Sequence, residues 1–225
     1  SRQRTASFPF IDRLLLINRR YLALCGLGFL AMASTIGAFV LAPFLLEDVN
    51  GLTAAVVGLV LLPQALMVTV FSRWVGRLAD RFDALKLVLF GFSLNLVVAG
   101  ALAFFAVGWS APALAVLFSL LGIGQAFVNS PLSVSVSRVV PPASIGAGLG
   151  LYNMMFFIGS SFGVASATSM LAARESAVGP LLSLYRGATA FSEFGDAYLV
   201  VIGFILVALA LGMLALRTTQ SGEQR

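Results

Sequence analysis

The sequence contains no histidine and only one cysteine, Cys25, among its 225 residues. The lack of histidine removes the commonest metal ligand and the usual proton switch near neutral pH. A single cysteine excludes an internal disulfide. Charged residues make up only 10% of the chain, against about a quarter of an average soluble domain. We therefore expect no enzyme activity, no cofactor or metal site, and no nucleic-acid partner.

Hydrophobic residues instead make up 60% of the chain, and the mean hydropathy is +1.01. Several charge-free runs exceed the roughly 20 residues that a helix needs to cross the hydrocarbon core of a bilayer. The expected fold is therefore an all-α membrane protein with a basic lead-in over residues 1–20, a six-helix bundle over 21–217 and a short tail over 218–225. The expected spans are residues 21–46, 52–72, 87–107, 113–137, 146–171 and 197–216.

The basic residues predict an orientation. If the six spans alternate in direction, Arg174 and Arg186 lie on one side of the membrane and the other basic residues lie on the opposite side. Basic loops are retained in the cytoplasm, so both termini are expected there. The protein is expected to be a multi-pass protein of the cell membrane, with the lipid bilayer as its first partner.

The segment Gly76–Lys86, between the second and third spans, is the most highly charged stretch of the chain. Glycine allows two helices to approach closely, and the carboxylate of Asp80 could meet the positive end of a neighbouring helix. Arg77 and Arg81 could hold that carboxylate through charge-assisted hydrogen bonds. Such a cluster would act as a conformational latch. The alternative is an ordinary solvated basic loop.

The run Gly76-Arg77-Leu78-Ala79-Asp80-Arg81 resembles the signature loop of the major facilitator superfamily, which joins the second and third helices of a six-helix repeat. The resemblance implies inverted three-helix repeats and makes Gly76, Asp80 and Arg81 the latch residues. The motif then decays, with Asp83 at the family's next glycine, as is typical of the second half of these transporters. Gly58–Gln64 and Val140–Gly148 are similar to the fourteen-helix drug–proton antiporter branch, which includes tetracycline and multidrug exporters.

Polar residues within the spans are candidates for a substrate cavity. Gln125 and Asn129 share one face of the fourth span with Gly122 and Ser133, and a polar stripe in hydrocarbon faces either a cavity or another helix. The family places the first and fourth helices around the cavity, which ranks these two residues above Asn95. Ser34, Phe39 and Gln64 complete the expected cavity, although Ser34 could bond its own backbone instead.

The fifth span carries Gly150, Gly159 and Gly163, spaced like the antiporter motif of drug exporters. Gly159-x-x-x-Gly163 continues to Ala167 and forms a smooth strip for close helix contact. The resemblance implies a helix that slides or bends as the access side changes. The alternative is ordinary small-residue packing.

These features together predict a secondary-active efflux transporter, or its C-terminal half, that exports small amphipathic compounds such as drugs. All acidic residues are expected outside the six spans, so proton coupling is expected in the missing half. The partner would be a separate first half, a second copy of the chain, or further residues of a longer gene product. The alternatives are a nutrient uptake permease and a non-transporting or vestigial half.

Overall fold

The computed structural model describes residues 17–105, 108–175 and 192–223, and within them it contains six long helices that confirm the expected fold class. The helices are α2 (Arg19–Phe44), α3 (Ala54–Arg81), α4 (Ala84–Phe105), α5 (Ala111–Val139), α6 (Ile145–Glu175) and α7 (Ser192–Glu223). Each is long and apolar enough to cross a membrane. A π-helical turn, Leu45–Val49, extends α2, and a short 3₁₀ turn, Pro142–Ser144, precedes α6.

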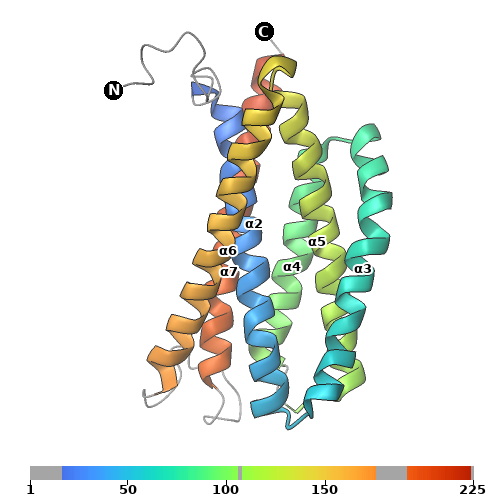
Figure 1. Ribbon diagram of the computed structural model, residues 1–225, viewed down its shortest axis with the longest axis vertical. Helices are drawn as coiled ribbons and strands as arrows, with labels where there is room; N and C mark the ends of the chain where they lie inside the picture. The colour runs from blue at the N-terminus through green and yellow to red at the C-terminus, as the bar shows by residue number, and fades with distance from the viewer. Residues whose placement is uncertain (1–16, 106–107, 176–191, 224–225) are drawn as a thin grey trace.

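The six helices form two layers (Figure 1). α6, α2, α5 and α3 lie in a row across the view of Figure 1, and α7 and α4 lie behind them. The closest pairs are α3 with α5 and α2 with α6, while α4 packs on α5 and α7, and α7 packs on α2. The second helix of each three-helix repeat thus packs against the first helix of the other repeat. This exchange locks the two repeats into one bundle.

Buried aromatic residues fill the core of the bundle. Phe92 of α4 and Phe118 of α5 are fully buried. Tyr21 and Tyr198 are also fully buried, and each hydroxyl donates a hydrogen bond to a backbone carbonyl of another helix. Tyr21 bonds Gly148 at 2.7 Å, and Tyr198 bonds Ala38 at 3.3 Å. The phenol groups are therefore satisfied where water is absent.

At one end of the bundle, two loops are tied together by Asn50. Its side-chain oxygen accepts a hydrogen bond of 2.9 Å from the backbone N–H of Gly108, in the turn that separates α4 from α5. Gly51 and Gly108 both have positive φ, 64° and 76°, a conformation in which glycine is favoured. Gly108 lies between the expected spans 87–107 and 113–137, and the two glycines allow the chain to reverse direction in these loops.

The opposite end carries Arg20, Arg73, Arg77, Arg81, Lys86, Arg138 and Arg217 and is called the basic end below. Here the structure differs from the sequence analysis, which placed residues 76–86 in a loop. α3 continues to Arg81 because Val75 and Ala79 remain buried against α5 while the charged side chains project outward. Only Phe82 and Asp83 connect α3 to α4.

The ends of the chain also differ from the expected boundaries. The last helix begins at Ser192 and runs to Glu223, so most of the expected tail is helical. The lead-in falls largely outside the described residues, which begin at Ile17. The other spans lie within the observed helices or differ from them by a few residues at an end, as expected where a charge-free run defines only the apolar part of a helix.

Asp83, which replaces a family glycine, has a structural role at the start of α4. Its Oδ1 accepts a hydrogen bond of 3.0 Å from the backbone N–H of Leu85, and its carbonyl accepts from Lys86. This is the geometry of an N-cap. The structure thus explains why the motif can decay at this position without loss of the turn.

Removing this cap gives a first prediction. Asp83→Ala is expected to destabilise the protein by about 1 kcal/mol, because the N–H of Leu85 loses its acceptor. Asp83→Asn keeps an acceptor oxygen and is expected to unfold close to wild type. Thermal unfolding in detergent compares the three proteins. Equal losses for both variants would show that the charge, and not the cap, matters at this position.

Candidate functional site

The expected latch lies at the basic end, and its carboxylate is paired with a residue that the sequence analysis did not select. Asp80, near the end of α3, accepts a hydrogen bond from Nη2 of Arg138 at 3.0 Å and forms a salt bridge with it. Arg138 lies in the last turn of α5. The side chains of Asp80 and Arg138 remain 69% and 53% exposed. The pair joins α3 to α5 and leaves Asp80 accessible to a further partner.

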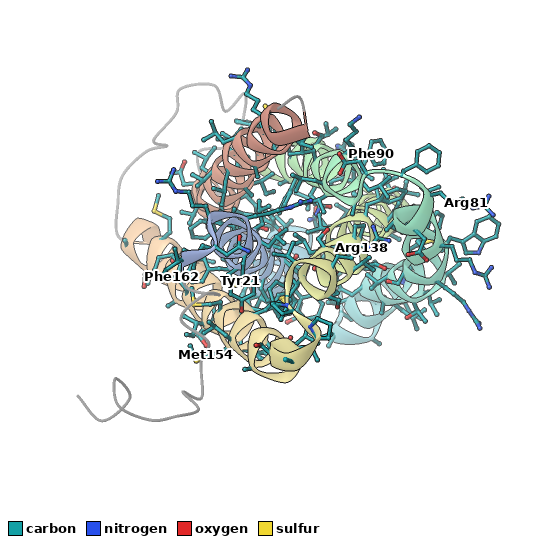
Figure 2. All side chains as sticks on the ribbon, turned by 90° about the horizontal axis from the view of Figure 1, so that it is seen from above. Tyr21, Arg81, Phe90, Arg138, Met154 and Phe162 are labelled. Carbon is teal, nitrogen blue, oxygen red and sulfur yellow. The ribbon has the colours of Figure 1, made fainter. Side chains whose placement is uncertain are left out.

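The expectation that Arg77 and Arg81 hold this carboxylate is not met. Within the described residues, neither arginine forms a salt bridge, and both are exposed on α3. In a helix, the four-residue spacing from Arg77 to Arg81 directs both side chains to one face. Figure 2 shows Arg81 at the outer edge of the bundle and Arg138 nearer its middle. The arginine that is adjacent in space comes from another helix.

Gly76 lies where α3 and α5 approach closely. A Cβ added at Gly76 would be 3.2 Å from Oγ of Ser130. The hydroxyl of Ser130 in turn donates to the carbonyl of Ser72 at 3.3 Å. The close approach expected at this glycine therefore occurs within the bundle, one turn before Asp80.

The fifth-span glycines divide into two groups. A Cβ at Gly159 would collide with the carbonyl oxygen of Phe29, and one at Gly163 with that of Ala33, so both glycines pack directly on the backbone of α2. Ala167 continues the strip and is fully buried. Gly150 is different, because it is exposed and has no atom within 4 Å of an added Cβ. The close-contact strip is thus Gly159–Ala167, without Gly150.

Three of the expected cavity residues are buried between helices. Gln64 is 5% exposed, and a Cβ at Gly122 of α5 would collide with its backbone carbonyl. Ser34 is 3% exposed and donates to the carbonyl of Ala31 at 3.0 Å, which matches the alternative of a bond to its own backbone. Gln125 is 7% exposed. All three side chains are thus enclosed by the bundle and have little exposed surface.

Gln125 instead faces the interior of the bundle. It lines a small cavity of about 10 Å³ together with Ser34 and with Asn95 of α4, which the sequence analysis had ranked lower. Oδ1 of Asn95 is buried without a hydrogen-bond partner in the described residues, as is Oε1 of Gln64. Burying a polar group without a hydrogen bond raises the free energy of the folded protein. The polar stripe of α5 therefore extends inward toward α4, as well as outward.

The remaining two cavity residues lie on accessible surface. Phe39 of α2 is 44% exposed, and its five-residue separation from the buried Ser34 places it about 140° around the helix. Asn129 is partly buried, and its carbonyl accepts a hydrogen bond of 3.1 Å from the exposed Ser133. α2 and α5, which carry these residues, are neighbours in the front row of Figure 1. Phe39 and Asn129 are thus the two candidates that remain available to a ligand.

The expectation that all acidic residues lie outside the spans is wrong, because the observed spans include Glu47, Asp48 and Asp80 near their ends. Asp196 was expected outside the last span, but it lies within α7, and its side chain is fully buried. The charge-free run begins only at residue 197, so sequence alone gave no signal that the helix starts earlier. Within residues 17–105, 108–175 and 192–223, no group of three His, Cys, Asp or Glu side chains is placed to hold a metal ion.

Comparison with known proteins agrees with this architecture. The family model of the Major Facilitator Superfamily matches residues 1–164. The chain is 30% identical over 151 residues to the lincomycin resistance protein LmrB of Listeria monocytogenes, and 31% identical over 169 residues to the multidrug export protein EmrB of Escherichia coli K12. It is 29% identical over 175 residues to the multidrug resistance protein Stp of Mycobacterium tuberculosis.

These alignments cover most of this chain and a minority of each relative. They include 67%, 75% and 78% of the chain, but only 32%, 33% and 32% of LmrB, EmrB and Stp respectively. The chain thus spans about a third of the length of the relatives it matches. Its six helices, its exchanged repeats and the match over residues 1–164 agree. The chain is a multi-pass membrane protein that belongs to the major facilitator superfamily.

Proposed function

We propose that this chain forms the six-helix C-terminal part of a secondary-active exporter of small amphipathic compounds. The observation that carries the proposal is its similarity to three proteins whose names describe drug resistance or export. The family match supports a transporter rather than an enzyme. Because the relatives are about three times as long as the matched segment, transport is proposed for the complete assembly.

The accessible surface of the bundle suits an apolar ligand. Phe39, Met154 and Phe157 are 44%, 52% and 65% exposed, and none of them carries charge. α2, which carries Phe39, packs against α6, which carries the other two. Aromatic and thioether groups bind varied apolar ligands with little directional demand, as expected for export of several drugs.

A second six-helix unit is proposed to cover α3 and α6. In their most apolar stretches only 17% of the residues are buried, against 50% for α2. The unmatched two thirds of each relative is long enough to supply such a unit. Transporters of this kind bind substrate between their two halves. The cavity would therefore lie between the row α6–α2–α5–α3 and the other unit.

The latch is proposed to act at the same interface. Asp80 is 69% exposed even while it pairs with Arg138, so one side of the carboxylate can meet the N-terminus of a helix in the other unit. This contact would form in one access state and break in the other. Proton coupling is proposed to depend on groups of the other unit. Asp196 is a buried carboxylate among the described residues of this one.

The direct test is transport by the complete protein. Expression in a bacterial strain without its own drug exporters is expected to lower the accumulation of ethidium and to raise drug resistance. Unchanged accumulation, at a verified membrane level of the protein, would contradict export. Accumulation of a nutrient by inverted or right-side-out vesicles would then distinguish an uptake permease from a non-transporting half.

A cavity variant gives a sharper prediction. Phe39→Ala is expected to reduce efflux of the most apolar dyes about tenfold, because loss of an aromatic contact weakens binding by about 1–3 kcal/mol. Leu206→Ala is the matched control, since Leu206 is 51% exposed on α7 in the back layer. Initial efflux rates in cells with equal protein levels compare the two. Equal losses of efflux in the two variants would show that the effect comes from folding or lipid contact, and that it does not come from substrate binding.

A further inference from the structure

A separate pocket opens at the basic end, between α2, α4, α5 and α7. Its volume is about 120 Å³, and it differs from the proposed substrate cavity in both location and lining. The polar part of the lining consists of Arg20, Ser135 and Arg138, with Asp83 also present. α4 and α7, which form one side of it, belong to the back layer of the bundle (Figure 1). The proposed second unit would therefore leave this side of the pocket uncovered.

The polar groups of the pocket favour a negatively charged occupant. Arg20, in the first turn of α2, and Arg138, in the last turn of α5, provide two guanidinium groups from separate helices. The hydroxyl of Ser135 adds a hydrogen-bond donor. α4 begins at Ala84, a lining residue, so the positive end of the α4 dipole lies at the pocket, while the negative C-terminal end of α5 lies beside Arg138. Arginine and helix N-termini are both common phosphate ligands.

Asp83 and Asp80 balance the two arginines in formal charge, but they do not occupy all of the hydrogen-bond donors. Oδ1 of Asp83 is hydrogen-bonded to the N–H of Leu85, as part of the cap of α4. Asp80 accepts its hydrogen bond from Nη2 of Arg138, and a guanidinium offers five N–H donors. Arg20 forms no salt bridge within the described residues. Donors therefore remain available to an anion that enters the pocket.

The rest of the lining is apolar. Leu24 of α2, Leu85 of α4 and Ala215 of α7 lie beside the charged groups. A free inorganic anion gains no apolar contact from this surface. The glycerol and the first methylene groups of a phospholipid can pack against it. Basic pockets between transmembrane helices are recognised sites for lipid headgroups. The pocket also lies at one end of helices that are long enough to span a bilayer, and lipid headgroups begin where the hydrocarbon core ends.

We propose that this pocket binds a phosphate group, supplied by an anionic phospholipid of the leaflet at the basic end. Arg20 and Arg138 hold the phosphate, the start of α4 faces it, and Leu24 and Leu85 contact the glycerol region. The site does not depend on whether the protein exports drugs, and its test measures binding without transport.

The experiment titrates the purified protein in detergent with short-chain dioctanoyl phosphatidylglycerol and follows binding by native mass spectrometry and thermal stabilisation. Inorganic phosphate and dioctanoylglycerol, which lacks phosphate, form two further arms. Arg20→Gln is expected to weaken phosphatidylglycerol binding about fivefold, the effect of removing one arginine near a lipid phosphate. Arg19→Gln is the matched control, because Arg19 is an exposed neighbour in the same helical turn but does not line the pocket.

The possible outcomes distinguish a lipid phosphate from a phosphate in solution, and they show which results would contradict the proposal. Binding of phosphatidylglycerol that depends on Arg20 but not on Arg19 supports the lipid site. Equal, Arg20-dependent binding of inorganic phosphate supports the phosphate site and assigns its source to solution. Equal weakening by Arg19→Gln and Arg20→Gln would overturn the proposal, because it would indicate general surface attraction. Binding of dioctanoylglycerol as tight as that of phosphatidylglycerol would overturn it as well.

Discussion

Replacing Gly159 or Gly163 by alanine is expected to destabilise the protein by about 1–3 kcal/mol at each site. The added methyl group would collide with a backbone carbonyl of α2, that of Phe29 at Gly159 and that of Ala33 at Gly163. A backbone oxygen cannot rotate away as a side chain can, so α2 and α6 would have to separate. α2 and α6 form one of the two closest helix pairs, and the whole bundle depends on their contact.

The matched control is Gly150→Ala in the same helix. No atom lies within 4 Å of a Cβ at Gly150, so the substitution is expected to leave stability unchanged or to raise it by up to about 1 kcal/mol, through the better helix propensity of alanine. Melting temperatures in detergent, together with the fraction of monodisperse protein, compare the three variants. A loss at Gly150 equal to that at Gly159 would show that direct contact with α2 does not explain the effect.

Much of the fold could be predicted from the sequence because lipid imposes a simple rule. A segment must be apolar over about 20 residues to span the bilayer, and that pattern is visible without any tertiary information. The packing strip Gly159–Ala167 was also visible, since small residues four apart form one helix face. Gly150 lies nine positions before Gly159, which is about 180° around the helix, so the helical spacing agrees with its exposure on the opposite face.

The candidate site was harder to predict because its partners are distant in sequence. Asp80 pairs with Arg138, 58 residues away, instead of with its neighbours Arg77 and Arg81. The packing of α3 against α5 determines which arginine lies close to Asp80. The spacing of residues along α3 does not reveal that packing. The position of Gln125 could not be predicted from the sequence for the same reason. A polar residue on a helix face could point to a cavity or to α4. The packing of the helices places Gln125 in the lining of one small cavity together with Asn95 and Ser34.

The charge of Asp80 has the largest expected effect on transport. Asp80→Asn is expected to slow efflux by the complete transporter about tenfold or more, the usual scale for a contact that distinguishes two conformational states. Its effect on stability is expected to be below about 1 kcal/mol, because an exposed salt bridge contributes little to folding. Asp48→Asn, an exposed carboxylate at the opposite end of the bundle, is the control and is expected to transport normally. Rates of ethidium efflux test the expected effect on transport, and melting temperatures test the expected effect on stability.

A charge exchange between the two residues separates the salt bridge from the latch. Asp80→Arg combined with Arg138→Asp restores an ion pair between α3 and α5 at the basic end. If Asp80 also meets the positive end of a helix in the second unit, an arginine at position 80 would be repelled from it. We therefore expect the double variant to fold like the wild type and still to fail in efflux. Recovery of efflux would instead show that the pair with Arg138 is sufficient, and the proposed contact with the second unit would be wrong.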